Sequence, residues 1–404
     1  MKPSFLVVSA LAAGLILNQL GIMAVPSLIL ELSARWRMDA TEVGWLGGIY
    51  FAGYAAALPF MSGAANRMDG RIVYTASAVI GALASLCFAL FADGFWLALL
   101  LRFAAGAGFA GVHIVGMKLM ADRLDGEVQA RAGALYTAAF AIGSGFSFLA
   151  AGLLVGRAGW EAVFVAASIG SLASIPVVLL IGPPAPGAEI RSNRLFPDFA
   201  AAFKDREVMR YVIAYGGNLW EVFAVRVWFV PFLAFSAMAS GDTASRWSPT
   251  TIAGLSVFIA VPVNLMVAEL GIRWGRRKAI ALVSVLSICV CLALGQMPHS
   301  AYEIALALLL LHALTSFGDV GAIAGGVVRA TDAETRAAAL ALFGLIGFSF
   351  GFLGPLSVGF AIDWSGGVDA PNAWLFAFAV MAIGSAISAL AMALPRAKPP
   401  TASE

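Results

Sequence analysis

The segment Gly271-Ile-Arg-Trp-Gly-Arg-Arg-Lys278 is a short basic connection between two long apolar stretches, and a similar connection, Asn66-Arg-Met-Asp-Gly-Arg71, occurs about half a chain earlier. Three residues of the earlier connection recur in the later one at offsets of 206, 205 and 205 positions: Arg67, Gly70 and Arg71 against Arg273, Gly275 and Arg276. A second set repeats the offsets of 206 and 205: Arg123 and Arg131 against Arg329 and Arg336. Two landmarks with one offset indicate two homologous halves.

The composition predicts a membrane protein. Hydrophobic residues make up 61% and charged residues 12% of the 404 residues, whereas soluble domains contain about 25% charged residues. A soluble fold of this length could not bury so much apolar surface, so we expect the lipid bilayer to be the solvent. The net charge of +2 says little about partners, and no nucleic-acid partner is predicted.

Motifs of enzymes and pumps are missing from the sequence. The cysteines Cys87, Cys289 and Cys291 lie in apolar runs without a CxxC pair or metal-ligand spacing, so neither a disulfide framework nor a metal site is predicted. The stretch Gly111-x4-Gly116-Met-Lys118 fails the phosphate-loop pattern, and neither GxSxG nor HExxH occurs. We therefore expect no catalytic residues, no cofactor and no ATP-driven pumping.

The apolar runs predict an all-α membrane protein with two pseudo-symmetric bundles of six helices. A transmembrane helix needs about 20 apolar residues. Twelve segments qualify: 4–30, 42–64, 71–92, 95–121, 131–156, 159–182, 208–237, 250–271, 278–297, 301–328, 337–361 and 371–394. A Pro-rich and then charged stretch separates the halves. The predicted domains are a first bundle, a cytoplasmic linker, a second bundle and a cytoplasmic tail: 1–182, 183–207, 208–395 and 396–404.

The basic residues predict the orientation. With the N-terminus inside, 19 of the 25 Lys and Arg residues lie in inner segments, four lie in outer segments, and Arg102 and Arg226 lie within spans. Cytoplasmic loops carry the excess of positive charge in membrane proteins. Both termini and the linker are therefore predicted to be cytoplasmic, in a bacterial-type plasma (inner) membrane.

Over nearly its whole length the chain resembles the major facilitator superfamily. The family's loop after the second span reads G-x-L-a-D-R-x-G-R-R, and its counterparts here are Ala268-Glu-Leu-Gly-Ile-Arg-Trp-Gly-Arg-Arg277 and, with one inserted residue, Ser62-Gly-Ala-Ala-Asn-Arg-Met-Asp-Gly-Arg71. The fourth span contains Arg102-Phe-Ala-Ala-Gly-Ala-Gly-Phe-Ala110, which resembles the motif R-x-x-x-G-x-G-x-A. Gly159-Trp-Glu-Ala-Val-Phe164 is similar to the G-W-R-W-x-F opening of the sixth span. Tyr215-Gly-Gly-Asn-Leu-Trp-Glu-Val-Phe223 faintly resembles bacterial permeases for cyanate and similar small anions.

Two departures from the family pattern affect what the resemblance implies. Asn66 and Ile272 stand where the family's loop has a carboxylate that helps to latch the cytoplasmic gate, with Asp69 and Glu269 nearby but out of register. The fifth span lacks the G-x-x-x-G-P sequence of proton-driven exporters, which disfavours a drug exporter. The residues assigned to gating loops are Arg67, Gly70, Arg71, Arg123, Arg131, Arg273, Gly275, Arg276, Arg329 and Arg336.

Polar residues in four spans are the candidates for substrate binding or coupling. The resemblance implies that spans 1, 4, 7 and 10 line a central cavity with the substrate site near the midplane. Ionisable groups inside a bilayer are costly, so they are functional candidates by default. The candidates are Asn18 and Gln19 in span 1, Arg102 and His113 in span 4, Asn218, Trp220, Glu221 and Arg226 in span 7, and His312 and Asp319 in span 10.

Helical geometry predicts which candidates share a face, because an α-helix advances by about 100° per residue. Arg102 and His113 are eleven residues apart, so they lie on one face, as do His312 and Asp319, which are seven apart.

Glu221 and Arg226 are five residues apart and point about 140° away from each other, so each needs a partner on another helix. We expect Glu221 to be the coupling site, because a carboxylate without a partner in a dry cavity takes up a proton readily. The alternative is that Arg102 reaches across from span 4 and keeps Glu221 ionised as a fixed bridge.

Each candidate also has a structural interpretation. The alternatives are bonds to helix carbonyls for Arg102, cross-bridges between the halves for Glu221 and Arg226, an inner gate contact for Asp319 beside His312, interior packing for His113, and cavity wall or packing for Trp220 and Trp228.

The sequence as a whole predicts a secondary transporter of a small solute, which works by alternating access and is coupled to an ion or proton gradient. Arg102 and Arg226 suit an anionic group, although with Glu221 and Asp319 the four charges sum to zero. The alternatives are a proton-driven efflux antiporter for drugs or metabolites, a membrane enzyme with catalytic groups clustered at a loop, and a sensor with a soluble domain. The predicted partners are the substrate, the bilayer and protons, and the expected functional unit is a monomer.

Reporter fusions test the orientation. We expect a fluorescent protein fused to the C-terminus to fluoresce and alkaline phosphatase at the same place to be inactive, because both termini are predicted to be cytoplasmic. As a control, fusions after Asp93, in a predicted outer loop, should show the opposite pattern. Alkaline phosphatase activity at the C-terminus would contradict the orientation.

Overall fold

The computed structural model describes residues 3–124, 126–182, 199–241, 247–297, 299–332 and 335–394. Within these ranges all regular elements are helices and no strand occurs, so the predicted all-α class is confirmed. Residues 183–198 of the predicted linker and the predicted tail 396–404 lie outside the described residues.

The helices follow the predicted spans closely. The first half forms α1 (Pro3–Asn18), the 3-10 turn η1 (Gln19–Gly21), α2 (Ala24–Trp36), α3 (Ala40–Arg67), α4 (Gly70–Phe91), α5 (Phe95–Ala121) and α6 (Gly126–Leu179). The second half forms α7 (Ala200–Lys204), α8 (Arg206–Ser240), α9 (Pro249–Trp274), α10 (Arg276–Gln296), α11 (Tyr302–Gly318), α12 (Val320–Ala330), α13 (Arg336–Trp364) and α14 (Ala373–Ala393). The end of the predicted linker is therefore helical, in α7 and the start of α8.

Interruptions explain where helices and predicted spans differ in number. Among the described residues, 11 helices are long and apolar enough to cross a membrane. Two predicted spans lie within α6, where Gly159 adopts the non-helical angles φ 80° and ψ 172°. This region of φ strongly favours glycine, so the two spans are separate helices that meet at this residue. The first and tenth spans are themselves interrupted, at residues 19–23 and at Asp319.

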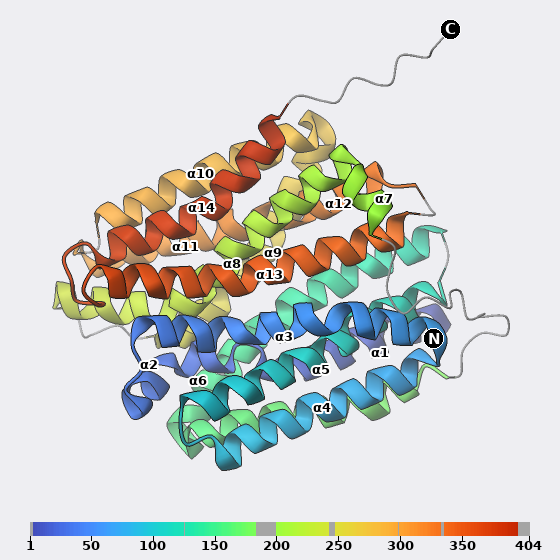
Figure 1. Ribbon diagram of the computed structural model, residues 1–404, viewed down its shortest axis with the longest axis horizontal. Coiled ribbons are helices and arrows are strands. Elements are labelled where there is room, and N and C mark those ends of the chain that lie inside the picture. Colours follow the sequence, from blue (N-terminus) through green and yellow to red (C-terminus); the bar gives the residue numbers. More distant parts are fainter. Residues whose placement is uncertain are drawn as a thin grey trace, which may run out of the picture.

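The two halves lie side by side with their helices running along the long axis of the molecule (Figure 1). Helices α3 and α13 face each other at the boundary between the halves. We call the end that holds the α3–α4 and α9–α10 connections the basic end, after Arg71 and Arg276–Lys278. We call the other end of the molecule, where α3 begins and α13 ends, the opposite end.

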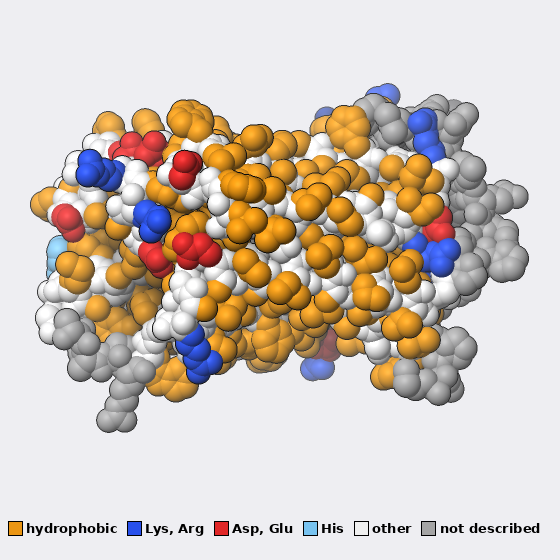
Figure 2. Space-filling view, turned by 90° about the horizontal axis from the view of Figure 1, so that it is seen from below, with side chains coloured by type: hydrophobic (Ala, Val, Ile, Leu, Met, Phe, Trp, Pro, Cys, Tyr) orange, Lys and Arg blue, Asp and Glu red, His pale blue; other side chains and the backbone are white. Residues whose placement is uncertain are grey.

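The surface has the pattern of an integral membrane protein. In Figure 2, hydrophobic side chains cover the middle of the molecule, and charged side chains gather towards its two ends. An apolar band between polar ends matches the hydrocarbon core of a bilayer. Together with the long apolar helices, this pattern places the protein in a membrane.

A carboxylate of the second half caps the first turn of α3 at the opposite end. Asp363 of α13 accepts hydrogen bonds from the backbone N–H groups of Ala40 at 3.0 Å and Thr41 at 2.6 Å. The next N–H group, that of Glu42, binds the side chain of Asp39 at 2.7 Å. The first N–H groups of a helix have no partner within it, so Asp363 satisfies two of them and joins the halves.

Replacing Asp363 with Ala tests this contact. We expect faster hydrogen–deuterium exchange of the Ala40 and Thr41 amides and a loss of about 1–3 kcal/mol of stability, because two donors lose their charged acceptor. Asp363→Asn keeps one acceptor oxygen and should have a smaller effect, whereas Asp39→Ala should affect mainly the Glu42 amide. Unchanged exchange in Asp363→Ala would show that the contact does not hold the halves together.

Candidate functional site

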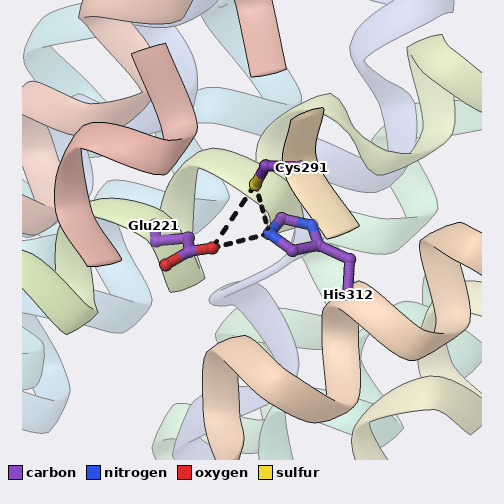
Figure 3. Close-up of side chains that lie close together, drawn as sticks. All are labelled: Glu221, Cys291 and His312. Atoms are coloured by element: carbon purple, nitrogen blue, oxygen red, sulfur yellow. Dashed lines mark hydrogen bonds and ion pairs between the residues drawn. The ribbon is translucent and has the colours of Figure 1, made fainter. Parts of the chain in front are cut away.

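Three polar side chains meet in the interior of the second half (Figure 3). Glu221 comes from α8, Cys291 from α10 and His312 from α11. Nε2 of His312 lies 2.7 Å from Oε1 of Glu221 and 3.0 Å from Sγ of Cys291. Glu221 and His312 are 1% and 0% exposed. A carboxylate removed from water needs partners of this kind, so the Glu221–His312 pair is the electrostatic centre of this half.

Two serine hydroxyls complete the surroundings of Glu221. Ser287 of α10 donates to Oε1 at 2.7 Å, and Ser385 of α14 donates to Oε2. The thiol of Cys291 lies 3.5 Å from Oε1. Both carboxylate oxygens therefore have partners, and Glu221 connects α8 to α10, α11 and α14.

The partner of Glu221 lies on another helix, as predicted from the helical geometry that excluded Arg226. The alternative in which Arg102 reaches across to Glu221 is wrong, because His312 occupies this position. The role of Glu221 in coupling stays a prediction. His312 lies 91 positions away in the chain, and only the packing of α11 on α8 brings the two together.

The same three residues form a candidate ligand set for a metal ion. Their oxygen, sulfur and nitrogen atoms lie within 4.8 Å of one another. A tetrahedral zinc ion binds such atoms at about 2.0–2.3 Å, which keeps them roughly 3.3–3.7 Å apart. Two of the pairs here are closer, at 2.7 and 3.0 Å, so the geometry is that of hydrogen bonds. That the chain holds no metal stays a prediction.

Asp319 lies at the interruption between α11 and α12. Its Oδ1 accepts a hydrogen bond from Nδ2 of Asn218 at 2.7 Å, and Nδ2 also donates to the carbonyl of Ser316. Ser284 is 3.5 Å from Oδ2, at the limit of a hydrogen bond. One oxygen of Asp319 is thus firmly bound and the other only weakly. Broken membrane helices are places where polar backbone and side-chain groups gather around ligands and ions.

The predicted shared face of His312 and Asp319 is confirmed, because both side chains meet α8. They contact different residues there, however: His312 binds Glu221, and Asp319 binds Asn218. The alternative of an inner gate contact for Asp319 beside His312 stays a prediction.

Arg226 is buried without a counter-ion. The side chain is 7% exposed, and its Cζ lies 5.6 and 5.5 Å from the ring centres of Phe223 and Phe317. Nη1 is buried without a hydrogen-bond partner, and within the described chain no carboxylate forms an ion pair with Arg226. A cavity of about 20 Å³ adjoins it between α6, α8, α9 and α11. A buried cation with unused donors is costly, so Arg226 is the strongest candidate for contact with an anion.

Arg102, the other arginine inside a span, has a different environment. It donates from Nη1 to the carbonyl of Gly21 at 2.9 Å and from Nη2 to that of Ile22 at 3.1 Å, and it lies 4.6 Å from the centre of the Tyr50 ring. These carbonyls belong to the break between α1 and α2, where helical bonds are missing. This environment matches the structural alternative, in which Arg102 holds span 4 against a neighbour.

Asn18 and Gln19 lie at the same break in the first span. Ser144 of α6 donates to Oε1 of Gln19 at 3.2 Å. Nδ2 of Asn18 and Nε2 of Gln19 are buried without a partner in the described residues. Both amides therefore keep a free donor, and their role in binding stays a prediction.

His113 belongs to an aromatic cluster. Its Nδ1 lies 2.7 Å from the hydroxyl of Tyr54, and its ring stacks on Phe109 and Tyr136 at 5.7 and 5.9 Å between centres. Arg102 and His113 contact residues one turn apart on α3, Tyr50 and Tyr54, which confirms their predicted shared face. The contacts of His113 match the packing alternative.

The two tryptophans of α8 hold neighbouring helices. Nε1 of Trp220 donates to the carbonyl of Val380 on α14 at 2.9 Å, and Nε1 of Trp228 donates to that of Pro355 on α13 at 3.1 Å. Their donors are thus used for packing, and a substrate contact of Trp220 stays a prediction.

In the first gating loop, an off-register carboxylate binds an arginine of the same loop. Arg67 ends α3 and Gly70 begins α4. Asp69, between them, accepts hydrogen bonds from Nη2 and Nε of Arg71 at 2.7 and 3.0 Å. The hydrogen bonds from Arg71 lower the pKa of Asp69 below its usual value. Asp69 therefore forms an ion pair within its own loop, although Asn66 stands at the family's acidic position.

The corresponding loop of the second half differs. Arg273 pairs with Glu269 of its own helix at 2.8 Å and is exposed. Gly275 has φ 98°, which allows the sharp turn into α10. Arg276 begins α10, and Arg329 lies in the last turn of α12. Both line a cavity at the basic end.

Three further arginines assigned to the gates flank these loops. Arg123 donates to the carbonyls of Leu119 and Gly182 at 3.1 and 3.2 Å, and Arg336 donates to that of Thr331 at 3.3 Å. Arg131 is an exposed residue of α6. Arg123 and Arg336 thus bind backbone carbonyls near helix ends at the basic end.

Sequence analysis missed several residues of the site. Ser287, Ser385 and Cys291 bind Glu221, and Asp363 joins the halves, yet none was a candidate. One signal was available: Ser287 and Cys291 are four residues apart in an apolar run and therefore share a helix face. Their target on α8 could not be read from that spacing.

Comparisons with known proteins agree with this architecture. A family model described as the Major Facilitator Superfamily matches residues 11–263. The niacin transporter NiaP of Acinetobacter baylyi is 28% identical over 161 residues, which cover 40% of this chain and 35% of that protein. Human protein spinster homolog 1 is 21% identical over 251 residues, which cover 59% of this chain and 48% of that protein. The chain thus matches about a third to a half of the length of these curated relatives.

Solved structures of transporters share the fold over almost the whole chain. A bacterial homologue of the human lysosomal transporter Spinster, inward-facing and occupied, has a TM-score of 0.74 at 16% identity and covers 97% of this chain and 96% of its own. A mutant of the nucleoside transporter NupG has a TM-score of 0.74 at 16% identity, covering 97% and 99%. A D-xylose–proton symporter has a TM-score of 0.75 at 14% identity, covering 96% and 97%.

These likenesses confirm the predicted fold class, and the family match indicates a transporter rather than an enzyme. The matched segment makes up more than half of the sequence, from the first span into the eighth. The chain belongs to the Major Facilitator Superfamily.

Proposed function

We propose that the protein is a secondary active transporter that carries a small anionic solute by alternating access and couples this movement to protons. Membership of the superfamily supports transport. A niacin transporter among the relatives and a D-xylose–proton symporter among the structural neighbours support a small solute and proton coupling. The side chains of Arg226 and Asp319 support the anionic character of the substrate and the choice of coupling residue.

The observation that carries the proposal is the unused guanidinium of Arg226. Arginine binds carboxylates through paired N–H donors, and Nη1 of Arg226 is a buried donor without a partner among the described residues. Phe317 lies against the guanidinium and lines the small cavity beside it, so it would provide an apolar wall for the rest of the substrate. Niacin, the substrate in the name of one relative, is a small aromatic carboxylate and fits these requirements.

For proton coupling, Asp319 is better suited than Glu221. Both oxygens of Glu221 already accept hydrogen bonds, from His312, Ser287 and Ser385. Oδ2 of Asp319 lies 3.5 Å from the Ser284 hydroxyl, at the limit of a hydrogen bond, and can therefore take a proton. A movement of α12 against α11 would change the surroundings of Asp319, because this residue separates the two helices. Proton binding and helix movement would then be linked.

The proposal includes the orientation and the functional unit. We infer that the two six-helix halves rock about the central site, that the basic end faces the cytoplasm of a bacterial-type cell, and that a monomer suffices for transport. The excess of basic residues in the predicted inner loops supports this orientation.

Replacing Arg226 with Gln tests the anion site. Purified protein is titrated with nicotinate, benzoate and acetate and with their uncharged amides, and the melting temperature is recorded. We expect at least one carboxylate, and none of the amides, to stabilise the wild type, with roughly 10- to 100-fold weaker affinity in Arg226→Gln because a charge-assisted pair is lost.

Arg102 provides a matched control, since it is as deeply buried but bound to the protein itself. Arg102→Lys should lower the melting temperature, because the carbonyls of Gly21 and Ile22 lose donors, while the carboxylate still stabilises the folded protein. Two outcomes would contradict an anion site at Arg226. One is that acids and amides stabilise the wild type equally, and the other is that the acids stabilise Arg226→Gln as much as the wild type.

Replacing Asp319 with Asn tests coupling in proteoliposomes. The uncharged amide cannot carry the proton, so we expect no accumulation on an imposed pH gradient, while exchange of labelled for unlabelled substrate continues. Glu221→Gln should impair both activities, because it breaks the pair with His312 and the contacts with α10 and α14. Accumulation by Asp319→Asn at the wild-type level would exclude Asp319 as the coupling group.

A further inference from the structure

A cavity with several basic lining residues lies at the basic end, outside the buried polar cluster around Glu221. A cavity of about 750 Å³ opens there between α8, the α9–α10 connection, α12 and α14. Its basic lining residues are Arg276, Arg277, Lys278 and Arg329. Cavities of roughly 300–1,000 Å³ are typical of sites for small ligands, so this one has room for more than an inorganic ion.

Two of these arginines converge on one place. The guanidinium of Arg276 lies over Gly325 of α12, since a Cβ atom added to Gly325 would be 3.2 Å from Nη2. Arg329 is one helical turn further along α12 and shares this face. Both side chains line the same cavity. Within the described part of the chain neither makes a hydrogen bond or an ion pair.

Among the described residues, the acidic group that lines the cavity does not compensate this charge. Glu207 lines the cavity, but its carboxylate binds Arg210 at 2.6 Å. Glu269 pairs with Arg273, and neither residue lines the cavity. Ile272, which does line it, stands where the family's loop motif has a carboxylate. The positive charge of Arg276 and Arg329 is therefore left for a ligand.

We propose that this cavity binds an anion that carries a phosphate group, held between Arg276 and Arg329. Guanidinium groups match the oxygens of phosphate through paired N–H donors. Arg277 is bound to the carbonyl of Met392 at 3.0 Å and to that of Leu394, so it forms part of the wall. Lys278 is exposed and adds positive charge at the rim.

A phosphate group can come from a lipid headgroup or from a soluble compound. The exposed apolar residues at the rim of the cavity favour a lipid. Ile272 and Trp274, which line the cavity, are 63% and 64% exposed. Apolar and aromatic side chains beside basic ones are typical of the membrane interface, where basic pockets bind anionic headgroups. A lipid would place its phosphate on the arginines and its acyl chains against the neighbouring apolar surface.

Lipid retention by the full chain tests the proposal. Protein in neutral detergent is titrated with phosphatidylglycerol, with phosphatidylcholine, and with pyrophosphate at matched ionic strength, and binding is followed by native mass spectrometry and melting temperature. We expect phosphatidylglycerol to bind and stabilise more than phosphatidylcholine, and each of Arg276→Gln and Arg329→Gln to weaken its affinity roughly tenfold.

Arg273→Gln is the matched control, because it removes the same charge from the same connection outside the cavity, and it should bind like the wild type. Ile272→Asp should weaken binding by supplying an internal counter-charge. If pyrophosphate stabilises the protein and the lipids do not, and if this effect is lost in Arg276→Gln, the cavity is a phosphate site for a soluble ligand. Absence of binding by either compound, or an equal loss in Arg273→Gln, would overturn it.

Discussion

No water reaches the interior of a bilayer, so each charged side chain within a span must find its partner in the protein. The pair Glu221–His312 meets this requirement in the second half and connects four helices through one carboxylate. Arg102 meets it in the first half through the carbonyls of the interrupted first span. These contacts determine how the helices around them can be packed, because removing one partner would leave the other charged or polar group unsatisfied.

At two places in the second half, positively charged side chains lack such a partner among the described residues. Arg226 lies among aromatic rings with an unused donor, and Arg276 and Arg329 line the same cavity at the basic end. A fold that leaves buried or clustered positive charge uncompensated gives up stability at that point. A ligand from outside can recover it, which is why both places are read as anion sites, one for the solute and one for a phosphate group.

The boundary between the halves is held differently along its length. At the opposite end, Asp363 caps α3 across the boundary. In the middle, the ring of Phe51 stacks on that of Phe223 at 3.7 Å between centres. At the basic end, the ion pairs Asp69–Arg71 and Glu269–Arg273 lie within single halves. Alternating access requires the halves to separate at one end of such a boundary while they stay in contact at the other. Separation at the opposite end would break the hydrogen bonds between Asp363 and the first turn of α3.

The membrane environment and the apolar spans could be predicted from the sequence, because they depend on composition and on patterns along the chain. The shared faces of Arg102 with His113 and of His312 with Asp319 also followed from helical periodicity alone. The sequence could not identify the hydrogen-bonding partners, which are His312 for Glu221, Asn218 for Asp319, and Asp363 for the first turn of α3. Nor did the apolar run 301–328 reveal the break at Asp319. These features became visible in the three-dimensional structure alone, because contacts between helices depend on how each helix is rotated and placed against its neighbours. A sequence pattern specifies the apolar face of a helix but not the residue that this face meets.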